Sequence, residues 1–301
     1  MTPREIIAEA WAITRREKSL RRWGYACSFL ETLFALKLIC YQVYFGYSYF
    51  ISGEQVGFFD DAIWLQQNVA PWAFFTIILT FMLLLVIEWF APHLCLGAII
   101  GLAAKSHNGE KMQGGLVLAL YNFFPIFAIH EFLILGGLPM VVTICSVILR
   151  YIPGEVKWLM VGLVVLFWIL SNVLKFFFSF AQPSIVIEKT GIFVAMGQSF
   201  KLVVSYLGQV MFLLLLLLVI SLRIFLNTLI ILVIPGIIFG ITFLLGTFLS
   251  AALTWIIAGI VAAALIGVAS YFFGYLHVFR EAVWTITFIE LRKHKDLDVI
   301  G

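Results

Sequence analysis

Long apolar stretches, separated by short polar segments, dominate this sequence. Uncharged runs cover residues 202–222 and 224–279, and a third run over 73–104 is interrupted only by Glu88. About 18 apolar residues are enough for a helix that spans a membrane, so each run is long enough to cross. The pattern predicts the all-α class: a polytopic transmembrane helical bundle of about six spans, preceded by an N-terminal amphipathic interfacial helix.

Polar connections divide the apolar part into successive spans. The third span would be too long for one straight crossing, and Pro125 predicts a kink in it. Gly136-Gly137-Leu138-Pro139 predicts a break further along the same span. The run over 224–279 has two interpretations: one span plus a re-entrant segment broken at Pro235-Gly236, or two spans. The first four spans are predicted at about 23–50, 72–104, from 116 onward and 156–180.

Basic residues gather at both ends of the chain. Six Lys and Arg lie within residues 1–22, and Arg292, Lys293 and Lys295 lie in the C-terminal tail. Because Lys and Arg flanking a span favour the cytoplasmic side, both termini are predicted to be cytoplasmic and the span number to be even. The predicted segments are an amphipathic juxtamembrane helix over 1–22, a six-span membrane domain over 23–290 and a short cytosolic tail over 291–301.

The first residues carry the signals of a helix start. Thr2-Pro3-Arg4-Glu5 matches a capping box with proline at the first helical position. Apolar residues then recur at helical spacing, which predicts an amphipathic helix. Such a helix either lies in the plane of the lipid headgroups or packs on the bundle as a cap. In the first case five cations would contact lipid headgroups: Arg15, Arg16, Lys18, Arg21 and Arg22.

The composition supports the membrane class and excludes others. Hydrophobic residues make up 63% of the chain and charged residues 12%, against about 45–50% and about 25% in soluble domains. The net charge is +3, and its basic residues flank apolar helices instead of forming one stripe, which excludes nucleic acid as a partner. Four cysteines lie in apolar segments without a C-x-x-C spacing and are predicted to be small buried hydrophobes: Cys27, Cys40, Cys95 and Cys145.

Several charged residues lie deep within the predicted spans. Counted from the nearest predicted cytosolic end at 1.5 Å per residue, four of them share a depth of ~21–26 Å. Two lysines and two glutamates make this layer formally neutral. It is either a site for an ion or substrate or a set of salt bridges that fix helix register. Nearer the cytosol, His277 could reach Glu31. The polar layer comprises Lys37, Glu88, Glu131 with its neighbour His130, and Lys175.

Motifs of catalysis and of cofactor binding are not found. His130-Glu131 is followed by Phe132-Leu133-Ile134, so it is not the H-E-x-x-H zinc motif. The chain has no G-x-S-x-G elbow and no phosphate-binding glycine loop. We therefore predict no enzyme activity, no catalytic residues, no cofactor and no metal.

Small residues recur at helical spacing and predict close helix packing. Flat faces let backbones approach where lipid provides no hydrophobic drive between helices. These faces would serve packing within the bundle or, alternatively, an oligomer interface. They are Gly97 with Gly101, Gly236 with Gly240, and the stripe Gly259, Ala263, Gly267 and Gly274.

Two groups of residues carry a family resemblance. The first is Trp11, Ile13, Thr14, Leu20, Trp23 and Gly24, and the second is Gln182-Pro183-Ser184-Ile185-Val186-Ile187-Glu188 with Gly191, Ala195 and Ser199. The pattern resembles uncharacterised bacterial membrane proteins that include the membrane domain of glycerophosphoryl-diester phosphodiesterase and related domains of unknown function. The resemblance implies a six-helix module in the bacterial cytoplasmic (inner) membrane. The phosphodiesterase of that family is a separate soluble domain, so its activity is not carried over.

Two functions remain open on these grounds. The first is a non-catalytic membrane subunit or scaffold that engages membrane lipids, other membrane proteins or a second copy of itself. The second is a transporter of a small molecule, an ion or a lipid that uses the polar layer.

The charge distribution predicts a topology that reporter fusions can test. Fusions after Gly53, Lys111, Gly154, Lys189 and Lys295 are expected to report outside, inside, outside, inside and inside, because cytoplasmic loops retain Lys and Arg. An external signal at Lys295 would contradict an even number of spans.

Overall fold

The computed structural model describes residues 1–53, 57, 59–133, 137–248 and 250–294. Within these ranges the chain forms helices and no strand, so the predicted all-α class is confirmed. The helices are α1 (Pro3–Arg16), α2 (Lys18–Tyr47), the π-helical turn η1 (Ser48–Ser52), α3 (Asp60–Asn68), α4 (Pro71–His107), α5 (Gly115–Phe132), α6 (Leu138–Tyr151), α7 (Val156–Phe177), α8 (Ala181–Glu188), α9 (Ile192–Ser205), α10 (Leu207–Gly246) and α11 (Ala251–His294).

Several of these helices are long and apolar enough to cross a membrane. Among the described residues four qualify: Lys18–Ser52, Pro71–His107, Val156–Phe177 and Leu253–Lys293. A fifth crossing is added if Ile192–Ser205 and Leu207–Leu218, which meet at 95°, count as one span. The predicted third span is divided into α5 and α6, which are 18 and 14 residues long. Length and composition therefore give four or five crossings, and the count of six stays a prediction.

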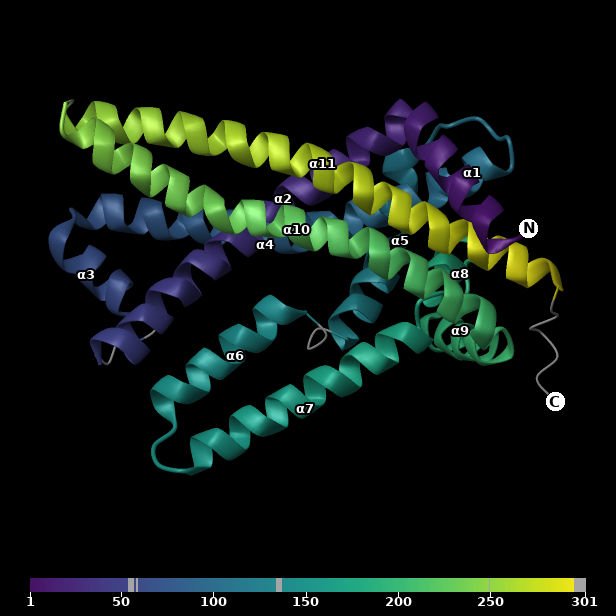
Figure 1. The fold of residues 1–301 in the computed structure, drawn as a ribbon, viewed down its shortest axis with the longest axis horizontal. Coiled ribbons are helices and arrows are strands. Elements are labelled where there is room, and N and C mark those ends of the chain that lie inside the picture. The colour runs from purple at the N-terminus through teal and green to yellow at the C-terminus, as the bar shows by residue number, and fades with distance from the viewer. Residues whose placement is uncertain (54–56, 58, 134–136, 249, 295–301) are drawn as a thin grey trace. The chain divides into compact units, whose positions relative to one another are not determined.

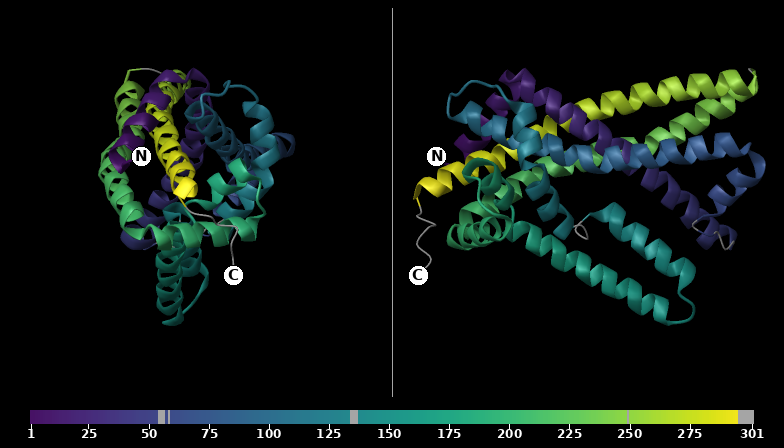
Figure 2. Two further views of the ribbon diagram at one scale, coloured as in Figure 1. Left: turned by 90° about the vertical axis from the view of Figure 1, so that its right-hand side faces the viewer. Right: turned by 180° about the vertical axis from the view of Figure 1, so that it is seen from behind.

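Helices α10 and α11 form a long antiparallel hairpin (Figures 1 and 2). They contain 40 and 44 residues, which is about 60 and 66 Å at 1.5 Å per residue. The α10 backbone stays helical through Pro235-Gly236, so the re-entrant segment that was one interpretation of 224–279 is not formed. That run instead supplies the end of α10 and the first part of α11.

The chain divides into two compact units. Unit 1 comprises Met1–Thr32, Ala91–Ile129 and Phe177–Gly301, and unit 2 comprises Leu33–Phe90 and His130–Phe176. In unit 1 the helices α1, α8 and α10 pack on α11. In unit 2, α6 and α7 run antiparallel (Figure 1).

Helix α1 is formed and packed as a cap on unit 1. The predicted capping box is present: Thr2 N donates to Glu5 Oε2 at 2.7 Å, and Glu5 N donates to Thr2 Oγ1 at 3.4 Å. The apolar face, with Ile6 and Ala10 fully buried, joins a core cluster with α4 and α11. This arrangement matches the interpretation of the helix as a cap on the bundle. A location in the headgroup plane stays a prediction.

The short helices α8 and α9 are held together by buried polar side chains. Ser199 Oγ donates to the Phe177 carbonyl at 2.8 Å and accepts from Phe180 N at 3.0 Å. Ser184 Oγ donates to Gln198 Oε1 at 2.7 Å. The Ser199 bonds satisfy backbone groups at the turn between α7 and α8, where helical partners are missing, and the Ser184–Gln198 bond joins α8 to α9. Part of the residue pattern behind the family resemblance therefore has a structural role in this turn.

Helices α2 and α11 cross in backbone contact at Gly24 and Gly274. A Cβ atom on Gly274 would lie 2.8 Å from the backbone C and O atoms of Gly24, and one on Gly24 would lie 2.7 Å from the Gly274 oxygen. Real Cβ contacts are not this short, so only glycine fits at either position. The crossing is the tightest glycine contact between backbones in the part of the chain that the structure describes.

The other predicted small-residue faces differ from one another. Gly97 and Gly101 pack against Leu118 of α5. Gly267 approaches only the Tyr25 hydroxyl, at 3.7 Å. The remaining members of the predicted set have no such role within the described residues: a Cβ on Gly236, Gly240 or Gly259 meets no atom within 4 Å, and Ala263 is exposed.

The backbone contact predicts an asymmetry between two glycines of α11. Gly274→Ala is expected to lower the free energy of unfolding by about 1–3 kcal/mol, because the added methyl group separates the two backbones. Gly259→Ala is the matched control and should be tolerated, since its Cβ meets open space. Thermal unfolding in one detergent measures both. Equal stability of the two variants would show that the α2–α11 backbone contact does not contribute to the free energy of unfolding.

Candidate functional site

The polar layer predicted from the sequence lies within unit 2. Lys37 Nζ of α2 donates to both carboxylate oxygens of Glu88 of α4, at 2.7 and 2.9 Å. Glu88 is only 3% exposed, while the Lys37 side chain is 31% exposed. Lys37 Nζ also lies 5.6 Å from the centre of the Phe81 ring, a cation–π distance. The two charges neutralise each other through a two-pronged ion pair.

The other members of the layer have different surroundings. Glu131 accepts a hydrogen bond from Trp89 Nε1 at 3.0 Å, and His130 Nδ1 lies 3.5 Å from its carboxylate. Lys175 is half-buried on α7. The structure therefore joins Lys37 to Glu88, and Glu131 to His130 and Trp89. The Trp89 contact was missed because an indole donor carries no charge signal in the sequence.

A second polar network connects three helices of unit 1. His107, at the end of α4, places Nδ1 2.6 Å from Glu9 Oε1 of α1 and Nε2 3.6 Å from Glu290 Oε1 of α11. Glu290 also accepts from the N-terminal amine of Met1 at 3.1 Å and from Lys293 at 2.6 Å. The network fastens α1 to the end of α11. The sequence did not indicate this network, because its members lie far apart along the chain and outside the long apolar runs where a charge attracts attention.

The predicted headgroup cations divide into two groups. Arg16 pairs with Glu17 at 2.8 Å and donates to Ser106 Oγ at 3.0 Å, so its guanidinium is engaged within the protein. Arg15 is exposed. The other three cations line a pocket that sequence reasoning did not identify.

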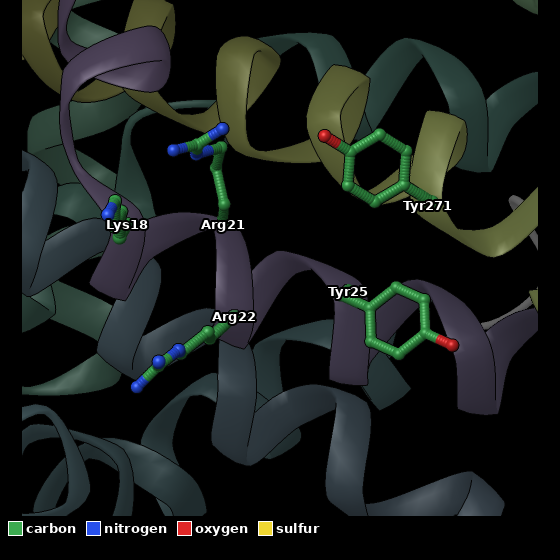
Figure 3. Close-up of a pocket in the computed structure, with 5 residues that line it drawn as sticks. All are labelled: Lys18, Arg21, Arg22, Tyr25 and Tyr271. Atoms are coloured by element: carbon green, nitrogen blue, oxygen red, sulfur yellow. The ribbon is translucent and has the colours of Figure 1, made fainter. Parts of the chain in front are cut away.

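This pocket has a volume of about 440 Å³ and lies between α2 and α11 (Figure 3). Lys18, Arg21, Arg22 and Tyr25 come from α2, and Tyr271 comes from α11. The two tyrosine side chains stand on opposite sides of the gap, and Lys18 and Arg21 lie at one end of it. The buried Arg21 Nε has no hydrogen-bond partner among the described residues. The pocket thus combines positive charge with aromatic walls.

A third cluster contains Cys27, Glu31 and His277, all within unit 1. The Cys27 Sγ atom lies 3.6 Å from Glu31 Oε1 and 3.7 Å from His277 Nε2. His277 Nδ1 lies 4.0 Å from Glu31 Oε2, which confirms the expectation that His277 could reach Glu31. The cluster offers one sulfur, one nitrogen and one oxygen atom as donors.

The predicted burial of the four cysteines is only partly right. Cys27 and Cys95 are buried, and Cys145 is half-buried. Cys40 is exposed, so the prediction is wrong there. The reason is geometric: an apolar helix has one face toward its neighbours and another toward its surroundings, and hydropathy alone does not distinguish them.

Comparison with protein-family models, with curated proteins and with solved structures finds no match to this chain. The geometry of these sites is therefore the basis for the function proposed below.

The Lys37–Glu88 pair predicts a non-additive response to mutation. Lys37→Met leaves the buried Glu88 carboxylate unpaired and is expected to lower stability by roughly 2.5–3.5 kcal/mol. Adding Glu88→Gln should recover much of that loss, because no unpaired charge remains. Unfolding in detergent measures the double-mutant cycle, with the exposed Glu155→Gln as control. Additive losses would show that the two side chains do not interact.

Proposed function

We propose that this chain is a non-catalytic integral membrane protein that binds anionic lipid headgroups in the pocket between α2 and α11. In this role it serves as a membrane subunit or scaffold, with its N-terminal segment on the cytoplasmic side. The observation that carries the proposal is the convergence of Lys18, Arg21 and Arg22 with two tyrosines at the start of an apolar helix.

The chemistry of the pocket suits a phosphate that is attached to an acyl chain. Arginine presents a planar set of donors that matches phosphate oxygens, and both Arg21 and Arg22 line the pocket. Tyrosine is enriched where membrane and water meet, because one end of the ring is apolar and the other polar. Tyr25 and Tyr271 are 39% and 52% exposed, so both rings are accessible to a ligand.

The position of the pocket along the chain supports the same conclusion. Lys18, Arg21 and Arg22 directly precede the apolar part of α2, the first helix long enough to cross. Cations at such a boundary lie at the depth of lipid phosphates on the cytoplasmic side. The proposed topology has six crossings and cytoplasmic termini: α2, α4, α5 with α6 as one interrupted crossing, α7, α10 and α11.

The alternative of transport through the polar layer has weaker support. Lys37 and Glu88 satisfy each other at 2.7 Å, and an internal neutral pair needs no ion or substrate. A catalytic role also has weak support, because the Cys27 thiol is only 1% exposed and a substrate would have to reach it. Both points favour a binding protein over a transporter or an enzyme.

Lipid binding by the pocket is testable with two charge-matched variants. Lys18→Gln with Arg21→Gln removes two pocket cations, and Arg4→Gln with Lys111→Gln removes two exposed cations outside the pocket. At about 1 kcal/mol per cation, the first variant should bind phosphatidylglycerol on the order of 30-fold more weakly than the wild type does. The purified protein in detergent is titrated with the lipid, and the lipids that co-purify are identified and quantified by mass spectrometry.

Retained affinity in the control variant would support a specific site. Equal losses in both variants would mean that net charge alone attracts the lipid, and an unchanged affinity in the pocket variant would exclude the site.

A further inference from the structure

Three donor side chains meet where α2 and α11 pack together. Cys27 and Glu31 are one turn apart on α2, so they face the same side of that helix. His277 approaches them from α11. Their donor atoms all lie within 4.8 Å of one another. Two residues at this helical spacing and a third from a facing helix resemble the way that helical bundles build metal sites.

The separations are close to those of ligands around one metal ion. Zinc binds sulfur at about 2.3 Å and histidine nitrogen or carboxylate oxygen at about 2.0–2.1 Å, so tetrahedral ligands are about 3.5 Å apart. In this cluster sulfur lies 3.6 Å from the Glu31 oxygen and 3.7 Å from His277 Nε2. The three donor atoms all lie within 4.8 Å of one another, so the Glu31 and His277 side chains would move by up to about an ångström to bring all three donors to bonding distance.

We propose that Cys27, Glu31 and His277 bind a divalent transition-metal ion of the zinc type. A thiolate and a carboxylate carry two negative charges that balance the dication, and the imidazole is neutral. The complex is thus neutral overall, which lowers the cost of placing it inside an apolar bundle. Binding requires the thiolate form of Cys27, so the thiol proton is released to solvent.

The donor set determines which ions fit. Sulfur and imidazole favour zinc, cobalt and other transition metals over magnesium and calcium, which prefer oxygen ligands. Three protein ligands leave a fourth position for water or another ligand. The Glu31 side chain is 49% exposed, so the cluster is open at the protein surface on the Glu31 side. The adjacent cation Arg280, one turn beyond His277, pairs with Glu281 at 3.1 Å, which offsets its repulsion of a metal ion.

Cobalt and zinc are suitable probes of the purified, detergent-solubilised protein. Co²⁺ bound to a thiolate gives a sulfur-to-cobalt charge-transfer band, and tetrahedral coordination gives intense visible bands. We expect one Co²⁺ per chain with both features, and displacement of Co²⁺ by Zn²⁺. Zn²⁺ should also raise the melting temperature, because it binds the folded state preferentially.

Variants at each ligand distinguish this site from adventitious binding. Cys27→Ser should abolish the charge-transfer band. Glu31→Gln and His277→Gln should weaken Zn²⁺ binding on the order of 100-fold or more, since loss of an outer-sphere partner alone costs about 10–100-fold. Glu31 is the position that is safest for folding, because its side chain is half exposed. Cys40→Ser and Cys145→Ser are controls outside the cluster and should bind as the wild type does.

The results decide the proposal either way. Absence of a charge-transfer band in the wild type overturns it, and so does a band that survives in Cys27→Ser. A band that is lost in Cys27→Ser but kept in both cysteine controls supports it, as does zinc stabilisation that disappears in Glu31→Gln.

Discussion

The backbone contact between Gly24 of α2 and Gly274 of α11 is the constraint on which both proposed sites depend. Side chains one position or one turn from the two glycines are brought within reach of each other because no Cβ separates the helices. On one side of the crossing this places Tyr25 near Tyr271 at the pocket. One turn further along both helices, Cys27 meets His277. A wider crossing would separate both sets of residues.

In both units, buried carboxylates among the described residues are matched by cations. In unit 2, Lys37 satisfies Glu88 inside the apolar helices. In unit 1, Glu290 is matched by Lys293 and by the N-terminal amine, and these contacts hold α1 on α11. The pocket differs, because its cations lie together and Arg21 Nε has no partner among the described residues. That excess of positive charge is the basis of the lipid site proposed above.

Local patterns were the most reliable guide to individual elements. The capping box at Thr2 and Glu5 was predicted and is present, because its bonds involve residues three apart. The break near Gly137 and Pro139 was also predicted, and α5 and α6 are separate helices. The break at Pro235-Gly236, one of two predicted interpretations, is not formed, since a long apolar helix tolerates proline when its other backbone bonds are kept. Proline and glycine therefore predicted helix boundaries correctly only where the adjacent residues were polar or rich in glycine.

The sequence by itself determined the all-helical class, the long apolar helices, the start of α1 and the residues whose charge is costly in a membrane. These depend on composition and on spacing within one helix, which hydropathy and helical periodicity report directly. Only the tertiary structure decided which charges pair, which glycines touch a backbone, and that Cys27, Glu31 and His277 meet. Such contacts join positions far apart along the chain, and a period of 3.6 residues says which face a residue occupies without saying what packs against that face.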